Sequence, residues 1–120
     1  MQSDIKLMVK IYNTYDLDWM GDEVKNVEFL TKHHIIKKED GGLNDISNYA
    51  LLTNRSHQLI HYLEENDYKT YCELNALFKK LNLTLAPPTE EYYEKVRSIL
   101  KRVKKEIKNG KRKRRKSRSR

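Results

Sequence analysis

Hydrophobic residues recur every three or four positions in three stretches of the chain, which is the period of an amphipathic helix. Residues 4–15 predict a first helix, although the same pattern also allows a strand. A second helical stretch begins at Thr53 or Asn54, either of which can cap it, and Asn66-Asp67 allows a break that would divide it in two. The apolar stripe of this second stretch consists of Ile60, Leu63, Tyr71, Leu74, Phe78 and Leu81.

The third stretch predicts a helix over residues 89–109. Pro87-Pro88 ends the preceding helix, because proline lacks a backbone N–H and restrains the residue before it. Thr89 then caps the new helix, and acidic residues in its first turns favour the positive end of the helix dipole. We expect Gly110 to end this helix. Its apolar stripe consists of Tyr92, Val96, Ile99, Val103 and Ile107.

A hairpin is predicted between the first two helical stretches. Residues 27–36 are apolar and β-branched enough for a strand, and residues 49–53 can return beside it. The connecting loop, residues 37–47, contains Gly41-Gly42, which supplies the conformational freedom that a chain reversal needs. The predicted fold class is therefore α+β, a small hairpin-plus-helix core with flanking helices, in one domain that covers residues 1–110.

Charge is distributed very unevenly along the chain. Residues 1–100 carry 12 Lys and Arg against 16 Asp and Glu, a net charge of −4, whereas residues 101–120 carry 13 against one, a net charge of +12. Residues 111–120 contain no hydrophobic residue, so we expect a disordered basic tail there. So dense a cationic block attracts polyanions, and we expect nucleic acid as its partner. An import signal, an anionic lipid or a solubilising tail are the alternatives.

Composition narrows the class of protein. With 120 residues, 38% of them hydrophobic, the chain has room for one small core but not for a two-domain enzyme. The single cysteine, Cys72, excludes an intramolecular disulfide and a zinc site built from several cysteines, and it suits a reducing cytoplasm. No apolar run approaches the roughly 20 residues of a membrane helix, so we expect no membrane partner.

All four histidines lie within residues 33–61. His57 and His61 are four positions apart on a predicted helix, so both imidazoles can face one ion. With His33 as a third ligand they would form a three-nitrogen site with open positions, which is typical of a catalytic metal. Each histidine pair taken alone is better explained as solvated surface.

The order and spacing of these features resemble the HNH endonuclease family. The resemblance covers residues 28–63 and includes His33-His34 followed by two isoleucines, the Gly-Gly loop, Asn48 before the apolar YALL, and His57-x-x-x-His61. The resemblance implies a ββα-metal fold that binds one divalent cation. It also implies a metal-dependent endonuclease that hydrolyses phosphodiester bonds in DNA.

The resemblance further implies a role for each of these residues. His34 would be the general base, and Asn48 would hold it in orientation. His33, His57 and His61 would be the metal ligands, as in the colicin-like version of the site with only histidine ligands. Many relatives carry cysteine pairs around the motif that bind a structural zinc. Because this chain lacks such pairs, we expect its helices to brace the hairpin.

The residue types suit this chemistry. Hydrolysis of a phosphodiester needs a cation on the phosphate and a base that deprotonates water near neutral pH, and a free imidazole has a pKa of about 6.5. Imidazole ligands favour transition metals over Mg, and the identity of the metal stays open among Zn, Ni, Mn and Mg. Expected contacts with nucleic acid come from cations beside the motif and in the tail: Lys32, Lys37, Arg55, Lys111, Arg112, Lys113, Arg114 and Arg115.

His33 and His34 pose a geometric difficulty. Adjacent residues on a regular strand point to opposite faces, so both can face one site only if the strand ends, twists or bulges there. We predict such an irregularity at this point of the chain.

Two other functions are compatible with the sequence: a non-catalytic nucleic-acid-binding module, and a partner-docking protein that keeps the fold. For the nuclease we expect DNA as the substrate, with RNA as a second candidate, and a homodimer that makes two cuts. Its expected location is the cytoplasm of a bacterium or of a phage-infected cell, or the nucleus if the source is eukaryotic.

Overall fold

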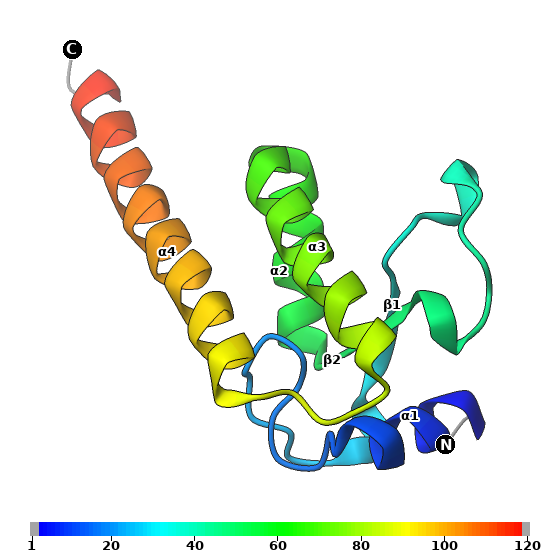
Figure 1. Ribbon diagram of the computed structural model, residues 1–120. Coiled ribbons are helices and arrows are strands. Elements are labelled where there is room, and N and C mark those ends of the chain that lie inside the picture. The colour runs from blue at the N-terminus through cyan, green and yellow to red at the C-terminus, as the bar shows by residue number, and fades with distance from the viewer. Residues whose placement is uncertain (1–2, 119–120) are drawn as a thin grey trace.

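The computed structural model describes residues 3–118, including the side chains of residues 3–105. Within this range the chain forms four α-helices and one two-stranded antiparallel sheet, which confirms the predicted α+β class (Figure 1). The helices are α1 (Ser3–Tyr12), α2 (Asn54–Asn66), α3 (Tyr68–Thr84) and α4 (Glu90–Arg118). The strands are β1 (Thr31–His34) and β2 (Tyr49–Leu52), and short 3-10 turns occupy Val27–Phe29, Lys38–Asp40 and Ile46–Asn48.

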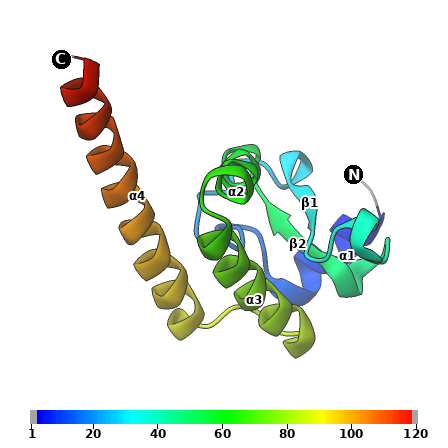
Figure 2. The same cartoon turned by 90° about the horizontal axis from the view of Figure 1, so that it is seen from above.

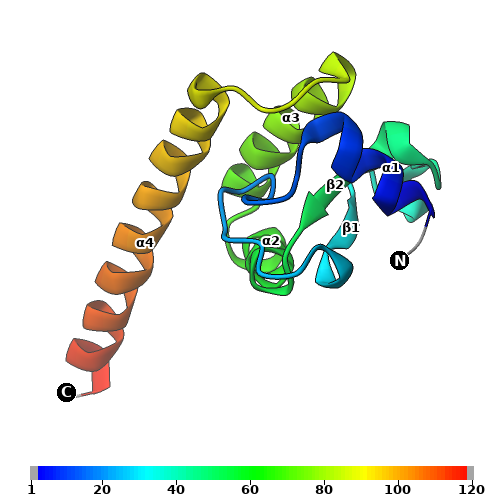
Figure 3. The same ribbon diagram turned by 90° about the horizontal axis from the view of Figure 1, so that it is seen from below.

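The hairpin lies at the centre of the fold. β1 and β2 pair in regular register, from Thr31 opposite Leu52 to His34 opposite Tyr49. Figures 2 and 3 show the hairpin between α1 on one side and the α2–α3 pair on the other, and all three helices contact β2. Every residue of β2 is buried, which explains why its sequence is apolar throughout rather than alternating.

β1 is shorter than the strand predicted over residues 27–36. The Asn26 side chain accepts a hydrogen bond from the Glu28 backbone N–H at 3.0 Å and so begins a 3-10 turn instead of a strand. β1 also ends at His34, although the Ile35 N–H still donates to the Asn48 carbonyl at 2.9 Å. The apolar residues before β1 belong to the turn at Val27–Phe29 and to Leu30, which is buried although it pairs with no strand.

The predicted helix boundaries are confirmed at three positions. Thr53 caps α2 and Asp67 caps α3, because each side chain accepts a hydrogen bond from the backbone N–H three residues later, at 3.2 and 3.3 Å. Thr89 caps α4 in the same way at 3.2 Å. Residues 3–12 form a helix and not the alternative strand, with a buried stripe of Ile5, Met8, Val9 and Tyr12.

Aromatic side chains fill the core between these helices. Trp19 is fully buried, and the rings of Tyr12 and Phe78 meet it edge to face, with centroids 4.8 and 6.3 Å away. The Tyr92 hydroxyl at the start of α4 donates to the Trp19 carbonyl at 2.5 Å. The loop that carries Trp19 therefore connects α1, α3 and α4.

α4 continues past its predicted end at Gly110 and runs to Arg118, beyond the other helices (Figure 1). The disordered tail predicted over residues 111–120 is therefore helical as far as the described residues reach. Lys and Arg are good helix formers, and one glycine in a helix costs only about 1 kcal/mol, so this composition permits the continuation. The side chains from residue 106 onward, Ile107 among them, and residues 119 and 120 lie outside the described part of the chain. Within residues 3–118 no helix is long and apolar enough to cross a membrane.

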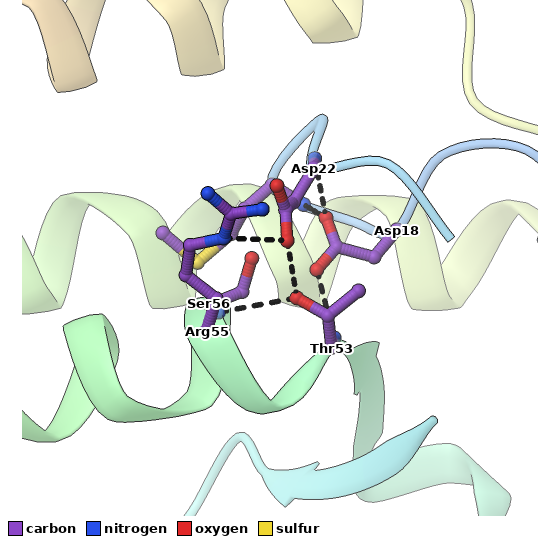
Figure 4. A network of polar contacts seen from close by, with 6 residues as sticks. Asp18, Asp22, Thr53, Arg55 and Ser56 are labelled. Atoms are coloured by element: carbon purple, nitrogen blue, oxygen red, sulfur yellow. Dashed lines mark hydrogen bonds and ion pairs between the residues drawn. The ribbon is translucent and has the colours of Figure 1, made fainter. Parts of the chain in front are cut away.

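A buried carboxylate joins the loop after α1 to the start of α2 (Figure 4). One oxygen of Asp18 accepts hydrogen bonds from the backbone N–H groups of Met20 and Asp22, each at 2.8 Å. Its other oxygen accepts one from the Thr53 N–H at 2.9 Å. The Thr53 hydroxyl in turn donates to Asp22 at 2.6 Å. This loop, with the helices, therefore braces the hairpin and fixes the start of α2, the helix that carries two of the histidines.

Replacing Asp18 should destabilise the fold strongly. The change Asp18→Ala leaves one buried and two partly buried backbone N–H groups without an acceptor. A buried group of this kind costs about 1–3 kcal/mol, so we expect a total loss of about 3 kcal/mol. Urea unfolding followed by tryptophan fluorescence measures it. Asp16→Ala, which removes an exposed carboxylate from the same loop, should change stability by less than about 0.5 kcal/mol. Equal unfolding midpoints for the two variants would contradict the bracing role.

Candidate active site

The four histidines line a single cavity of about 290 Å³. His33 and His34 come from the last two positions of β1, and His57 and His61 come from the first two turns of α2. The chain passes from β1 through the loop and β2 directly into α2, so the hairpin brings both pairs to the same place. The remaining wall of this histidine cavity consists of Lys32, Lys37, Lys38, Glu39, Glu64 and Tyr71.

His33 is the innermost of the four. Its side chain is buried, and its ring meets the rings of Phe78 and His57 edge to face, with centroids 5.8 and 5.9 Å away. Its Nε2 donates a hydrogen bond to Asn75 Oδ1 on α3 at 2.8 Å, which leaves Nδ1 with a free lone pair. Burial lowers the pKa of His33 from 6.5 to about 4, because the surrounding core disfavours the charged ring. His33 is therefore neutral near pH 7.

His57 is held in one tautomer. Its Nδ1 lies 2.7 Å from the hydroxyl of Thr31, and this hydroxyl donates its only hydrogen to the Leu52 carbonyl at 2.9 Å. Nδ1 must therefore carry the hydrogen, and Nε2 has the free lone pair. Burial lowers the pKa of His57, and the neighbouring His61 lowers it further through charge repulsion.

His61 is more exposed and stacks on His57. The two rings are nearly parallel, with centroids 4.8 Å apart and planes 18° apart. His61 Nδ1 lies 3.9 Å from a carboxylate oxygen of Glu64, one turn further along α2. Glu64 also forms an ion pair with Lys37 across the cavity.

His34 lies at the end of β1, against the ring of Tyr49, with centroids 5.1 Å apart. Its Nε2 donates to Asn44 Oδ1 at 2.8 Å, so its Nδ1 is the nitrogen that can accept a proton. The irregularity predicted at His33 and His34 takes the form of the strand end. The register through both residues is regular, without a bulge.

Among the described residues, the side chain of Asn48 bonds to the loop after β1 rather than to the ring of His34. Asn48 accepts a hydrogen bond from the Ile36 N–H at 2.8 Å and donates to the carbonyls of Ile36 and Leu43 at 2.8 and 3.0 Å. Gly42 permits this arrangement, because a Cβ there would lie 1.8 Å from the Ile36 carbonyl oxygen. Asn48 therefore clamps the loop between the strands, and Asn44 is the residue that orients His34.

The cations predicted to contact nucleic acid differ in their availability. Lys32 Nζ lies 3.1 Å from a carboxylate oxygen of Asp4, and Lys37 is paired with Glu64. Arg55 lies 3.6 Å from a carboxylate oxygen of Asp22, but its side chain is 77% exposed. The side chains of residues 111–115 lie outside the described part of the chain.

The donor set suits a metal ion, but the side chains are not arranged as ligands. His33 and His57 are neutral and each has one free lone pair, as a ligand must. Among the described side chains, no group of three His, Cys, Asp or Glu is placed to hold a metal ion. The stacked rings of His57 and His61 explain this, since lone pairs in two parallel ring planes do not meet at one point. The histidines predicted to converge on one ion thus share a cavity, but they are not placed as ligands of that ion. To bind it together, at least one of the imidazole rings must rotate.

The sequence does not reveal most partners of these histidines. Thr31 is the exception, because it lies two positions before His33 and so on the same side of β1. Asn44 carries no signal beyond its place in the glycine loop. Asn75 and Glu64 carry no signal in the sequence. Asn75 reaches His33 only through the packing of α3, and Glu64 reaches the cavity only because α2 is long enough.

The comparison with protein families agrees with this geometry. Residues 21–63 match the family model described as HNH endonuclease. The matched segment runs from the loop braced by Asp18 through the hairpin to the second half of α2, and it contains all four histidines. No curated protein and no solved structure matches the chain. Residues 21–63 of this chain are therefore similar to the HNH endonuclease domain.

Proposed function

We propose that this protein is a metal-dependent endonuclease that hydrolyses phosphodiester bonds in DNA. The observation that carries the proposal is the single cavity lined by four imidazoles, with lysines at its edge, inside the segment that matches the HNH model. Such a cavity offers nitrogen ligands for a metal ion, and that ion would in turn bind an anionic phosphate. RNA as a second substrate, a homodimer and a cytoplasmic location are further parts of this proposal.

His33, His57 and His61 are the proposed ligands of one divalent ion, which would be Zn, Ni, Mn or Mg. When bound, such an ion stabilises negative charge on the phosphate and on the leaving oxygen. Neutral His33 and His57 suit this role, because a protonated ring has no lone pair to offer. Their partners Asn75 and Thr31 hold each ring by its other nitrogen, as is usual for ligating histidines.

His34 is the proposed general base. Its Nε2–H is directed to Asn44, so Nδ1 can accept the proton of an attacking water molecule. Asn44 is the proposed orienting residue for this ring, the role that the family resemblance implies for Asn48. A non-catalytic binding module would use the same cavity without this proton transfer.

Affinity for DNA is proposed to come mainly from the basic end of α4. The first 100 residues carry a net charge of −4, so DNA would repel this part of the protein. Lys32 and Lys37 would have to exchange their carboxylate partners for phosphates, whereas Arg55 is largely exposed. The eight Lys and Arg of residues 111–120 supply the compensating positive charge.

Replacing His34 should separate catalysis from binding. With Mn²⁺ or Ni²⁺, the change His34→Ala should slow the nicking of supercoiled plasmid by at least about 100-fold, because a positioned base contributes 10²–10⁴-fold. Binding of the plasmid should be unchanged. Gln58→Ala, an exposed neighbour on α2 that does not line the cavity, is the control and should cleave normally. A wild-type chain that binds DNA but cleaves none with any of these metals would instead support the non-catalytic module.

The burial of His33 should make the metal-free protein less stable in acid. The unfolded chain takes up a proton at His33 near pH 6.5, but the folded protein does so only near pH 4. Above pH 6.5 His33 is neutral in both the folded and the unfolded state, so the protein has its full free energy of unfolding there. This free energy should fall by up to about 3 kcal/mol between pH 6.5 and 4.

Urea unfolding at a series of pH values, with a chelator present, measures this dependence. The variant His33→Gln should lose most of it, whereas His61→Gln, which changes an exposed histidine, should keep it. A wild-type slope in His33→Gln would show that the acid sensitivity arises elsewhere.

Removing residues 111–120 should weaken DNA binding and flatten its dependence on salt. Each phosphate contact that is lost lowers the slope of log K against log salt by about 0.9. Fluorescence anisotropy of a labelled duplex over a range of salt concentrations measures the slope, and metal uptake should be unaffected. A truncated chain with the slope of the full chain would overturn the role given to this segment.

A further inference from the structure

A second cavity, of about 230 Å³, adjoins the histidine cavity. Its walls come from the start of α3 and from the segment that follows β1, and it shares Lys37 and Tyr71 with the histidine cavity. It is smaller than the 300–1,000 Å³ typical of sites for drug-sized ligands, which suits a single planar group. This tyrosine cavity lies outside the HNH match on its α3 side.

Two stacked tyrosines form one wall of this cavity. The rings of Tyr68 and Tyr71 have centroids 5.5 Å apart and planes 29° apart. Tyr71 is buried, whereas Tyr68 is 63% exposed and offers the outer face of the stack to solvent. A large aromatic ring left this exposed at the mouth of a cavity is a surface on which a further planar ring can stack.

The charges around the tyrosine cavity favour a base over a phosphate. Asp40 lines this cavity and would repel a phosphate, but its carboxylate can accept hydrogen bonds from the N–H groups of a base. The histidine cavity is lined by three lysines and two glutamates, whereas the tyrosine cavity is lined by one lysine and one aspartate. A nucleotide with its phosphate at the histidines could therefore place its base against Tyr68.

We propose that the tyrosine cavity binds one unpaired nucleobase next to a phosphate at the histidine cavity. The proposal rests on the nuclease function proposed above and narrows its substrate class. A base within a duplex is paired and stacked on its neighbours, so it must leave the helix before it can enter a side pocket. The favoured substrate is therefore DNA with a single-stranded or unpaired nucleotide at the cleavage position.

Asn75 connects the two cavities. It lines the tyrosine cavity, and its Oδ1 accepts the hydrogen bond that orients His33. A base in the tyrosine cavity would thus lie beside the residue that holds one of the proposed metal ligands.

Cys72 makes occupation of the tyrosine cavity measurable. It is the only cysteine of the chain, it is exposed, and it lines this cavity. With the full chain and a chelator present to prevent cleavage, we would follow the rate at which a thiol reagent modifies Cys72. Single-stranded DNA should protect the thiol, whereas an abasic strand of equal length and a fully paired duplex should protect it much less. Equal protection by the abasic strand would overturn the proposal, because the backbone alone would then account for it.

Variants of Tyr68 test the stacking surface. Tyr68→Ala should weaken binding of single-stranded DNA by about 5- to 150-fold, whereas Tyr68→Phe should bind like the wild type. Tyr62→Ala, which removes a tyrosine of α2 that is 43% exposed and lines neither cavity, is the matched control. Unchanged affinity in Tyr68→Ala would also overturn the proposal.

The two proposals fail in different ways. If Cys72 is protected by bases but no metal supports cleavage, the nuclease function is wrong and the base site stands. If plasmid is nicked but Cys72 is equally reactive with and without single-stranded DNA, the base site is wrong and the nuclease function stands.

Discussion

The buried carboxylate of Asp18 is the constraint on which the geometry of the histidine cavity depends. A charge inside the protein is tolerated only where hydrogen-bond donors surround it, and the three N–H groups that serve Asp18 belong to its own loop and to the first residue before α2. Satisfying this charge therefore fixes where α2 begins. Because His57 and His61 lie in the first turns of that helix, their position relative to β1 follows from the same hydrogen bonds. Side-chain and backbone hydrogen bonds thus brace the start of α2.

The site is completed from outside the matched segment. The HNH match ends within α2, but α3 supplies Asn75, which orients His33, and Tyr71 and Phe78, which surround the His33 ring. The burial that keeps His33 neutral is thus a product of the helix packed over the hairpin. The HNH segment alone could not exclude water from this ring to the same degree.

Features that depend on neighbouring residues could be predicted from the sequence, and those that depend on the path of the chain could not. The caps Thr53, Asp67 and Thr89 each bond to an N–H three residues away, so local pattern suffices for them. The histidine spacing likewise predicted a common cavity. The orientation of the Asn48 amide depends on how the loop folds back at Gly42, and no periodicity encodes that. Asn75 lies 42 positions from its partner His33, so only the tertiary packing of α3 brings the two together.

The regular pairing of β1 with β2 decides which side chains of β1 face the core. His33 lies opposite Ala50 and is buried, whereas His34 lies opposite Tyr49 and is more exposed, although both line the histidine cavity. Sliding one strand by a single residue would exchange the two, placing the wrong imidazole against Asn75 and the other against solvent. Changes of length at the tip of the loop leave this pairing intact. An insertion of one residue within β1 would instead exchange the faces to which its side chains point. Homologous or engineered versions of this domain can therefore vary between the strands far more freely than along them.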